Sequence, residues 1–229
     1  MFNNFFNFEK ILDTFNYIFW FFLLNLLFML LNIPLILFFV FIGISSLFNY
    51  FPLFLICLLP TMPALTILFY CMNKIIIHND LNVIKDFFNG LKLNFKQSFL
   101  IWFFETIMFL ILYFNIKFFL PIKYGIFLIC LFAAIAIILV AVTPFIFILI
   151  SKFKMDSISI LRTASILCFT RPILTITNLL VFIIALILFE IAPGTTILFI
   201  SSILSFSIMF VNKSLLFELE DISKKQETI

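Results

Sequence analysis

Long apolar runs follow one another along this chain, and short polar stretches separate them. Most of the runs have about 20 residues, the length that an α-helix needs to cross a hydrocarbon core of roughly 30 Å. The pattern predicts an all-α fold: a polytopic helical membrane protein with about six transmembrane helices in a single integral membrane domain, residues 1–229. We place the spans at residues 15–48, 53–76, 97–114, 124–150, 172–190 and 196–217.

The first apolar run is too long for one upright crossing. As a continuous helix, residues 15–48 would extend roughly 50 Å, and Pro34 lies inside this run. A proline removes a backbone donor and clashes with the preceding helical turn. We therefore expect one long, bent or tilted span. A span followed by a short re-entrant piece after Pro34 is the alternative.

Two polar islands interrupt the runs, the first from His78 to Lys96 and the second from Ser151 to Arg171. Both repeat apolar residues at helical period, which predicts two amphipathic surface helices, at residues 80–95 and 156–169. The apolar stripe of the first island consists of Ile84, Phe87, Phe88, Leu91 and Phe95. A weak parallel repeat of span, surface helix and span is one explanation of this similarity, and coincidence of topology is the other.

The basic residues predict the orientation. Of the 14 Lys and Arg residues, 12 lie at the amino end, in or beside the two islands, or near the carboxyl end, and only Lys117 and Lys123 lie on the other side. By the positive-inside rule, both termini and both surface helices face the cytoplasm. Six spans satisfy this assignment, whereas five or seven would require the first run to be divided.

The composition identifies lipid as the main partner. The chain is 65% hydrophobic and 11% charged, whereas a soluble domain is roughly half apolar and about a quarter charged. Its net charge of +3 is small, and we expect no nucleic-acid partner. A homo-oligomer is compatible with the sequence.

Patterns that carry catalysis or bind metals are scarce. The chain has one histidine, His78, and four cysteines without close spacing, so the paired ligand motifs of metal sites cannot be assembled. It has only 4 glycines, and none of them forms a phosphate-binding loop. We therefore predict that the protein is not an enzyme and has no catalytic residues, metal or cofactor.

Glu105 is the sharpest candidate for a functional residue. It lies about eight residues into the third span, roughly 12 Å along the helix axis. Ionisable groups at such depth are costly and tend to mark functional sites inside a bundle. The structural alternative is that Glu105 reaches toward Lys96 at the interface or bonds Asn25 inside the bundle.

Two asparagines and two prolines join Glu105 in the predicted intramembrane ligand region. Asn25 and Asn32 share one face of the first span, where interhelical hydrogen bonds would also explain them. Pro60 and Pro63 should leave unpaired carbonyls near mid-membrane, and transporters build substrate sites at broken helices of this kind. A simple packing kink is the alternative explanation for the prolines.

Charged residues of the surface helices form a second candidate site, for docking of a partner or of lipid. Anionic headgroups and a protein partner explain the same residues. The residues are Lys85, Asp86, Lys92, Lys96 and Arg162.

Three segments carry a resemblance to a known family. They are LLNLLFMLLNIPL, LLPTMPALTILFYCMNKI and NDLNVIKDFFNGLKLNFKQSFLIW. Over about residues 8–112, the chain resembles the YesL-like family of bacterial integral membrane proteins, a domain of unknown function. The apolar stretch between the first two spans is longer than in many members of that family.

The resemblance implies a bacterial cytoplasmic membrane protein that is an accessory component of carbohydrate uptake or its regulation. Sugar-transporter or sensor subunits would then be its partners, and the family supplies no catalytic residues to carry over. A small permease with a midplane substrate site is one alternative. A structural membrane scaffold is the other.

Overall fold

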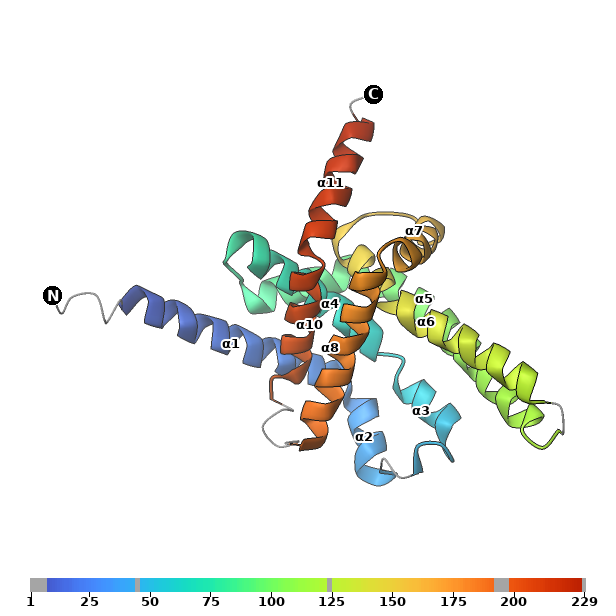
Figure 1. Cartoon of the computed structure of the whole chain (residues 1–229). Helices are drawn as coiled ribbons and strands as arrows, with labels where there is room; N and C mark the ends of the chain where they lie inside the picture. The colour runs from blue at the N-terminus through green and yellow to red at the C-terminus, as the bar shows by residue number, and fades with distance from the viewer. Residues whose placement is uncertain (1–7, 44–45, 123–124, 192–197, 228–229) are drawn as a thin grey trace.

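The computed structural model describes residues 8–43, 46–122, 125–191 and 198–227. Over these ranges the chain consists of helices joined by turns and short loops, with no strand, so the all-α prediction is confirmed (Figure 1). The helices are α1 (Phe8–Leu31), α2 (Ile33–Phe41), α3 (Phe51–Cys57), α4 (Thr61–His78), α5 (Val83–Phe119), α6 (Ile126–Lys152), α7 (Ser157–Thr170), α8 (Pro172–Ile191), α10 (Ile200–Val211) and α11 (Lys213–Glu227).

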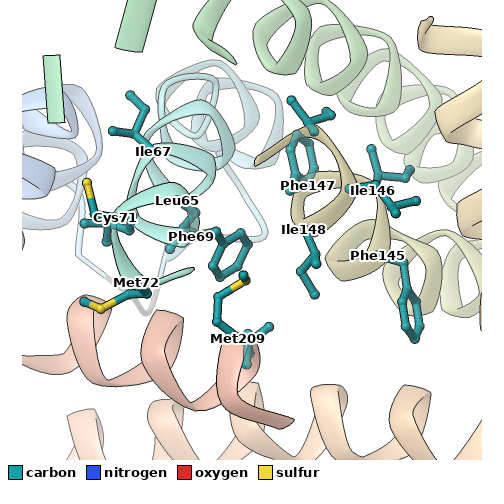
Figure 2. Close-up of a cluster of buried hydrophobic side chains, with 14 of the residues drawn as sticks. Leu65, Ile67, Phe69, Cys71, Met72, Phe145, Ile146, Phe147, Ile148 and Met209 are labelled. Atoms are coloured by element: carbon teal, nitrogen blue, oxygen red, sulfur yellow. The ribbon is translucent and has the colours of Figure 1, made fainter. Parts of the chain in front are cut away.

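Helix α4 lies at the centre of the molecule, where it contacts α1, α5, α6 and α10. Its residues 63–69 are all buried, and so are residues 141–151 in the second half of α6. Figure 2 shows the apolar side chains that fill this core, including Phe69 of α4, Phe147 of α6 and Met209 of α10. A helix that is buried on all faces needs apolar residues all round, which is what these two segments supply.

The α5–α6 hairpin extends away from this core (Figure 1). Many large apolar side chains of its distal part are exposed, among them Phe118 of α5 and Phe127 and Ile137 of α6. A monomeric soluble protein rarely exposes so large an apolar surface. Lipid is the environment that this surface fits.

Three stretches of the described chain are each long and apolar enough to cross a membrane: Phe51–His78, Val83–Phe119 and Ile126–Lys152. Three pairs of helices pass the same test together but are bent at a short break, by 72° between α1 and α2, 98° between α7 and α8, and 52° between α10 and α11. The described residues therefore hold 3 to 6 candidate spans, and the upper value equals the predicted six.

The first apolar run bends at Asn32, between α1 and α2. Pro34 occupies the first turn of α2, where its missing N–H leaves no hydrogen bond unmade. With 9 residues, α2 is roughly 14 Å long and too short to cross a bilayer. It contacts α3 through Phe38 and Phe54, whose ring centroids are 5.5 Å apart. The bend agrees with the predicted kink in this run, and it belongs to the bent span as well as to the re-entrant alternative.

The first island differs from the prediction, because α5 runs unbroken through 37 residues. The surface helix expected at residues 80–95 and the span expected at residues 97–114 are thus one helix, and their separation was wrong. No proline lies within α5. Its one glycine, Gly90, allows close packing on α4, since a Cβ there would lie 2.9 Å from Cδ1 of Tyr70.

The second island agrees with the prediction. Helix α7, expected at residues 156–169, spans Ser157–Thr170 and meets α8 at 98°. The next two spans were expected at residues 172–190 and 196–217. The first coincides with α8. The second begins outside the described residues, at 196–197, and its described part bends at Asn212 between α10 and α11.

Candidate functional site

Glu105 lies on α5 with its carboxylate between α5 and α6, and the residue is 6% exposed. Its Oε1 is 3.4 Å from the hydroxyl of Thr143 on α6. That hydroxyl has one proton, and the Leu139 carbonyl, at 2.8 Å, is the closer acceptor. The other carboxylate oxygen, Oε2, is buried and accepts no hydrogen bond from the described residues. Glu105 is therefore a buried carboxylate with little internal compensation.

A groove of about 490 Å³ lies beside this carboxylate, between α5, α6 and α7. Besides Glu105, its polar side chains are two serine hydroxyls of α7. The lining consists of Leu100, Ile101, Phe104, Glu105, Met108, Ile138, Leu139, Val142, Ile146, Ser157, Leu161 and Ser165. The groove thus combines apolar walls with one carboxylate and two hydroxyls.

The groove opens on the outer surface of the bundle. Phe104 at its rim is 63% exposed, and Met108 and Ile138 are also exposed. These side chains lie in the two long apolar helices that are candidate spans. Their exposed faces fit lipid, so the groove opens laterally, toward the membrane.

Helix α7 forms one wall of the groove, and a side chain of α5 holds its beginning. Gln97 donates from Nε2 to the carbonyl oxygen of Met155 at 2.8 Å and lies 3.3 Å from the hydroxyl of Ser157. Gln97 lies two turns before Glu105 on the same helix. Helix α5 therefore carries both the Glu105 carboxylate and the Gln97 side chain that holds the α7 wall.

The two predicted asparagines make interhelical contacts elsewhere in the bundle. Asn25 Oδ1 accepts a hydrogen bond of 3.1 Å from the backbone N–H of Ser201, next to the start of α10. Asn32 accepts one of 2.8 Å from the hydroxyl of Thr61, and its Nδ2 donates to Phe28. Both asparagines are buried. These are the packing contacts that the structural alternative predicted.

Pro60 and Pro63 begin a helix, whereas the sequence had placed them inside a broken one. Pro60 is the residue before α4, and Pro63 lies in its first turn, where no backbone donor is needed. Between α3 and α4, the Leu58 carbonyl oxygen accepts hydrogen bonds of 3.0 Å from the backbone N–H of Thr61 and from Nε1 of Trp102 on α5. The break between the two helices is thus a hydrogen-bonded turn that is tied to α5.

The five predicted intramembrane residues do not form one site. Asn32 and the prolines meet around Thr61, Asn25 lies against α10, and Glu105 lies in the groove. Thr143, Ser157 and Ser165 were not predicted from the sequence. No motif marks them, because single hydroxyls on apolar helices are common.

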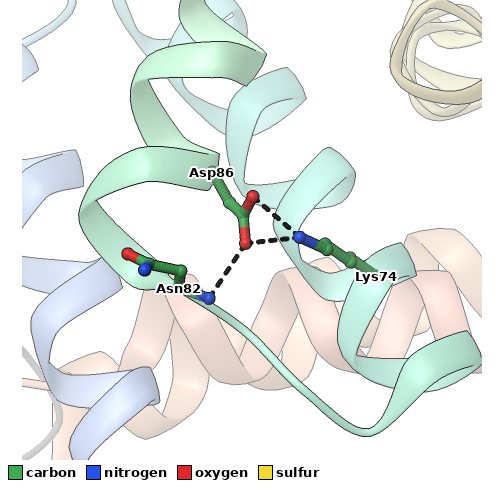
Figure 3. A network of polar contacts seen from close by, with 3 residues as sticks. All are labelled: Lys74, Asn82 and Asp86. Atoms are coloured by element: carbon green, nitrogen blue, oxygen red, sulfur yellow. Dashed lines mark hydrogen bonds and ion pairs between the residues drawn. The ribbon is translucent and has the colours of Figure 1, made fainter.

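Four of the predicted docking residues are exposed, namely Lys85, Lys92, Lys96 and Arg162. Asp86 is not available for docking because the residue is 4% exposed. Both of its oxygens lie 2.8 Å from Nζ of Lys74, and the backbone N–H of Asn82 donates to Oδ2 at 2.9 Å (Figure 3). Asp86 closes the turn between α4 and α5, and its docking assignment was wrong.

The helices and the lateral groove define a multi-pass α-helical membrane protein. Residues 18–116 match the model of a family described as a protein of unknown function, DUF624. This match includes Glu105 and the Lys74–Asp86 pair, whereas the α6 and α7 walls of the groove lie beyond it. Comparison of the chain with curated proteins and with solved structures finds no match.

Proposed function

We propose that this protein is a small, non-enzymatic transporter of the bacterial cytoplasmic membrane that binds its solute in the groove beside Glu105. One observation carries the proposal. A buried carboxylate with an oxygen that accepts no hydrogen bond within the described chain faces a groove of about 490 Å³ that opens to lipid. Ionisable residues at membrane depth are expensive and usually serve a ligand, an ion or a proton path.

The contrast with Asp86 supports a functional role for Glu105. Where this chain uses a buried carboxylate to hold helices together, it supplies an ammonium group and a backbone N–H within 2.9 Å. Glu105 receives only a hydroxyl at 3.4 Å. Burying a carboxylate without such partners destabilises the fold. The destabilisation that comes from burying Glu105 is explained if a bound solute supplies the missing partner.

The test is uptake into proteoliposomes across a panel of radiolabelled amines, amino acids and sugars. Ser165→Trp fills the groove, and Ser159→Trp places the same bulk on an exposed position of α7 that does not line it. We expect saturable uptake of at least one solute, lost in Ser165→Trp and retained in Ser159→Trp. Absence of saturable uptake for every solute, or equal uptake by both variants, would reject the proposal.

A second candidate function is the accessory role in carbohydrate uptake that the family resemblance implies. The observation that favours it is the start of α5, where Ile84 is 59% and Phe88 51% exposed beside the exposed Lys85 and Lys92. An amphipathic face of this kind suits a protein partner as well as the membrane surface.

Co-purification from native membranes in mild detergent tests the accessory role. We expect sugar-transporter or sensor subunits to accompany the wild-type protein and to be lost when Lys85 and Lys92 are changed to Glu. Lys117→Glu, at the opposite end of α5, is the matched control. If the charge reversals leave the associated subunits unchanged, docking through this face is excluded.

A further inference from the structure

We propose that the groove takes a hydrophobic organic cation, a molecule with an ammonium or phosphonium centre and an apolar body. This inference rests on the proposed solute site and names its substrate class. The observation behind it is the charge of the lining, which contains one carboxylate, two hydroxyls and no basic side chain. The groove is an apolar surface with a single buried carboxyl group.

The charge requirement follows from what surrounds Glu105. Its only hydrogen-bonding neighbour among the described residues is the Thr143 hydroxyl, and no ion pair of the described chain includes it. Opposite charges attract far more strongly at low effective dielectric than in water. A cation delivered into the groove would therefore supply the partner that Lys74 supplies to Asp86.

The apolar requirement follows from the walls. Nine of the twelve lining residues are apolar, and the rim, with Phe104, Met108 and Ile138 exposed, faces lipid. Phe104 also brings an aromatic ring to the lining, and aromatic rings attract cationic centres. A sugar is a poor fit, because most of its hydroxyls would lose water without gaining a hydrogen-bond partner. The groove therefore favours a lipid-soluble cation over a carbohydrate.

The experiment measures binding of radiolabelled tetraphenylphosphonium to the full chain in lipid nanodiscs by equilibrium dialysis. Tetraphenylborate, an anion of nearly the same shape, is the probe control. Glu105→Gln removes the charge and keeps the size, and Glu190→Gln makes the same change at an exposed position of α8 outside the groove. Size-exclusion profiles and thermal unfolding establish that each variant is folded.

We expect saturable binding of tetraphenylphosphonium, weaker by about tenfold or more in Glu105→Gln and unchanged in Glu190→Gln, with no saturable binding of tetraphenylborate. Equal binding of both probes, insensitive to Glu105→Gln but lost in Ser165→Trp, would overturn the charge requirement and leave the solute site intact. Binding that survives Ser165→Trp would show that the probe does not bind in the groove, and it would overturn the proposed site. No binding of either probe would overturn the cation assignment, while the uptake panel would still decide the proposed function.

Discussion

The two polar islands have similar sequences of apolar and charged residues and different structures. In the first, α5 continues for 37 residues through the island and into the membrane. In the second, α6 ends at Lys152, α7 forms a separate helix, and the chain turns 98° into α8. Helical periodicity predicted a helix in each island. It did not reveal whether that helix continues into the next span.

Proline distinguishes the two islands. Pro172 begins α8 directly after Arg171, whose φ of −121° and ψ of 62° lie outside the helical region, and a proline disfavours the helical conformation of the residue before it. The corresponding residue of the first island, Lys96, is followed by Gln97 and lies inside α5. The parallel repeat, one of the two explanations of the islands' similarity, does not extend to their conformation.

The polar contacts that hold the two islands also differ. An ion pair between the partly exposed Lys74 and the buried Asp86 fixes the start of α5. The second island is held at its start by hydrogen bonds from Gln97 and at its end by an exposed Arg171–Glu218 pair, and exposed pairs contribute little to stability. The polar contacts of the α7 wall are thus hydrogen bonds and an exposed ion pair, whereas the α5 wall, which carries Glu105, begins at the Lys74–Asp86 pair.

The largest expected effect comes from giving the first island the proline of the second. Lys96→Pro places a proline in the interior of α5, which removes a hydrogen bond and clashes with the preceding turn. We expect the free energy of unfolding to fall by about 3 kcal/mol or more, measured by circular dichroism during SDS titration in mixed micelles. Lys96 is exposed, so little packing is lost with its side chain.

Lys85→Pro is the matched control for this change, since it introduces the same residue into the first turn of the same helix. There the N–H has no partner within the helix, and we expect a loss of under about 1 kcal/mol. If both variants lost the same free energy, the continuity of α5 would contribute nothing to stability, and the two islands would not differ in the way described.

A smaller loss should follow from breaking the ion pair that fixes the first island. Asp86→Ala leaves Lys74 without its partner and opens the turn between α4 and α5. The Lys74 side chain is 37% exposed, so water compensates part of the loss, and we expect about 2 kcal/mol in the same titration. Asp80→Ala, at an exposed position of the same turn, should change stability by less than about 0.5 kcal/mol. Equal effects of the two variants would show that Asp86 is not the anchor.

The sequence predicted the fold well where a single physical property decides the outcome. Run length and hydropathy gave the helices α4, α6 and α8, and helical periodicity gave α7. The 72° bend between α1 and α2 could not be given a size from sequence, because it depends on α2 packing against α3. The continuity of α5 was not predicted, because the polar residues up to Lys96 indicated the end of a separate surface helix. The same residues also fit a single helix that leaves the membrane without bending.

The candidate site was predicted in part. Glu105 was found because a charge inside an apolar run is conspicuous. The predicted neighbours of Glu105 were wrong, since Asn25 and the prolines belong to other helix contacts. Thr143 and the α7 serines become neighbours of Glu105 only through the crossing of α5, α6 and α7, and a tertiary arrangement of this kind has no signature in the local sequence.

The smallest expected effect concerns Pro172, the proline of the second island. The experiment asks whether this proline or the contacts between α7 and α8 keep the two helices at 98°. Pro172→Ala supplies an N–H at the first position of α8, where none is needed, so stability should change by less than about 1 kcal/mol. The 98° angle should persist, because Cys168 of α7 is buried and its carbonyl oxygen accepts a hydrogen bond of 2.9 Å from Thr175 of α8. Spin labels at Ser159 and Thr177, measured by electron–electron resonance in nanodiscs, should keep the wild-type mean distance with a broader distribution. A shift to about 27 Å, the length of a straight helix between these positions, would show that the proline alone keeps α7 apart from α8.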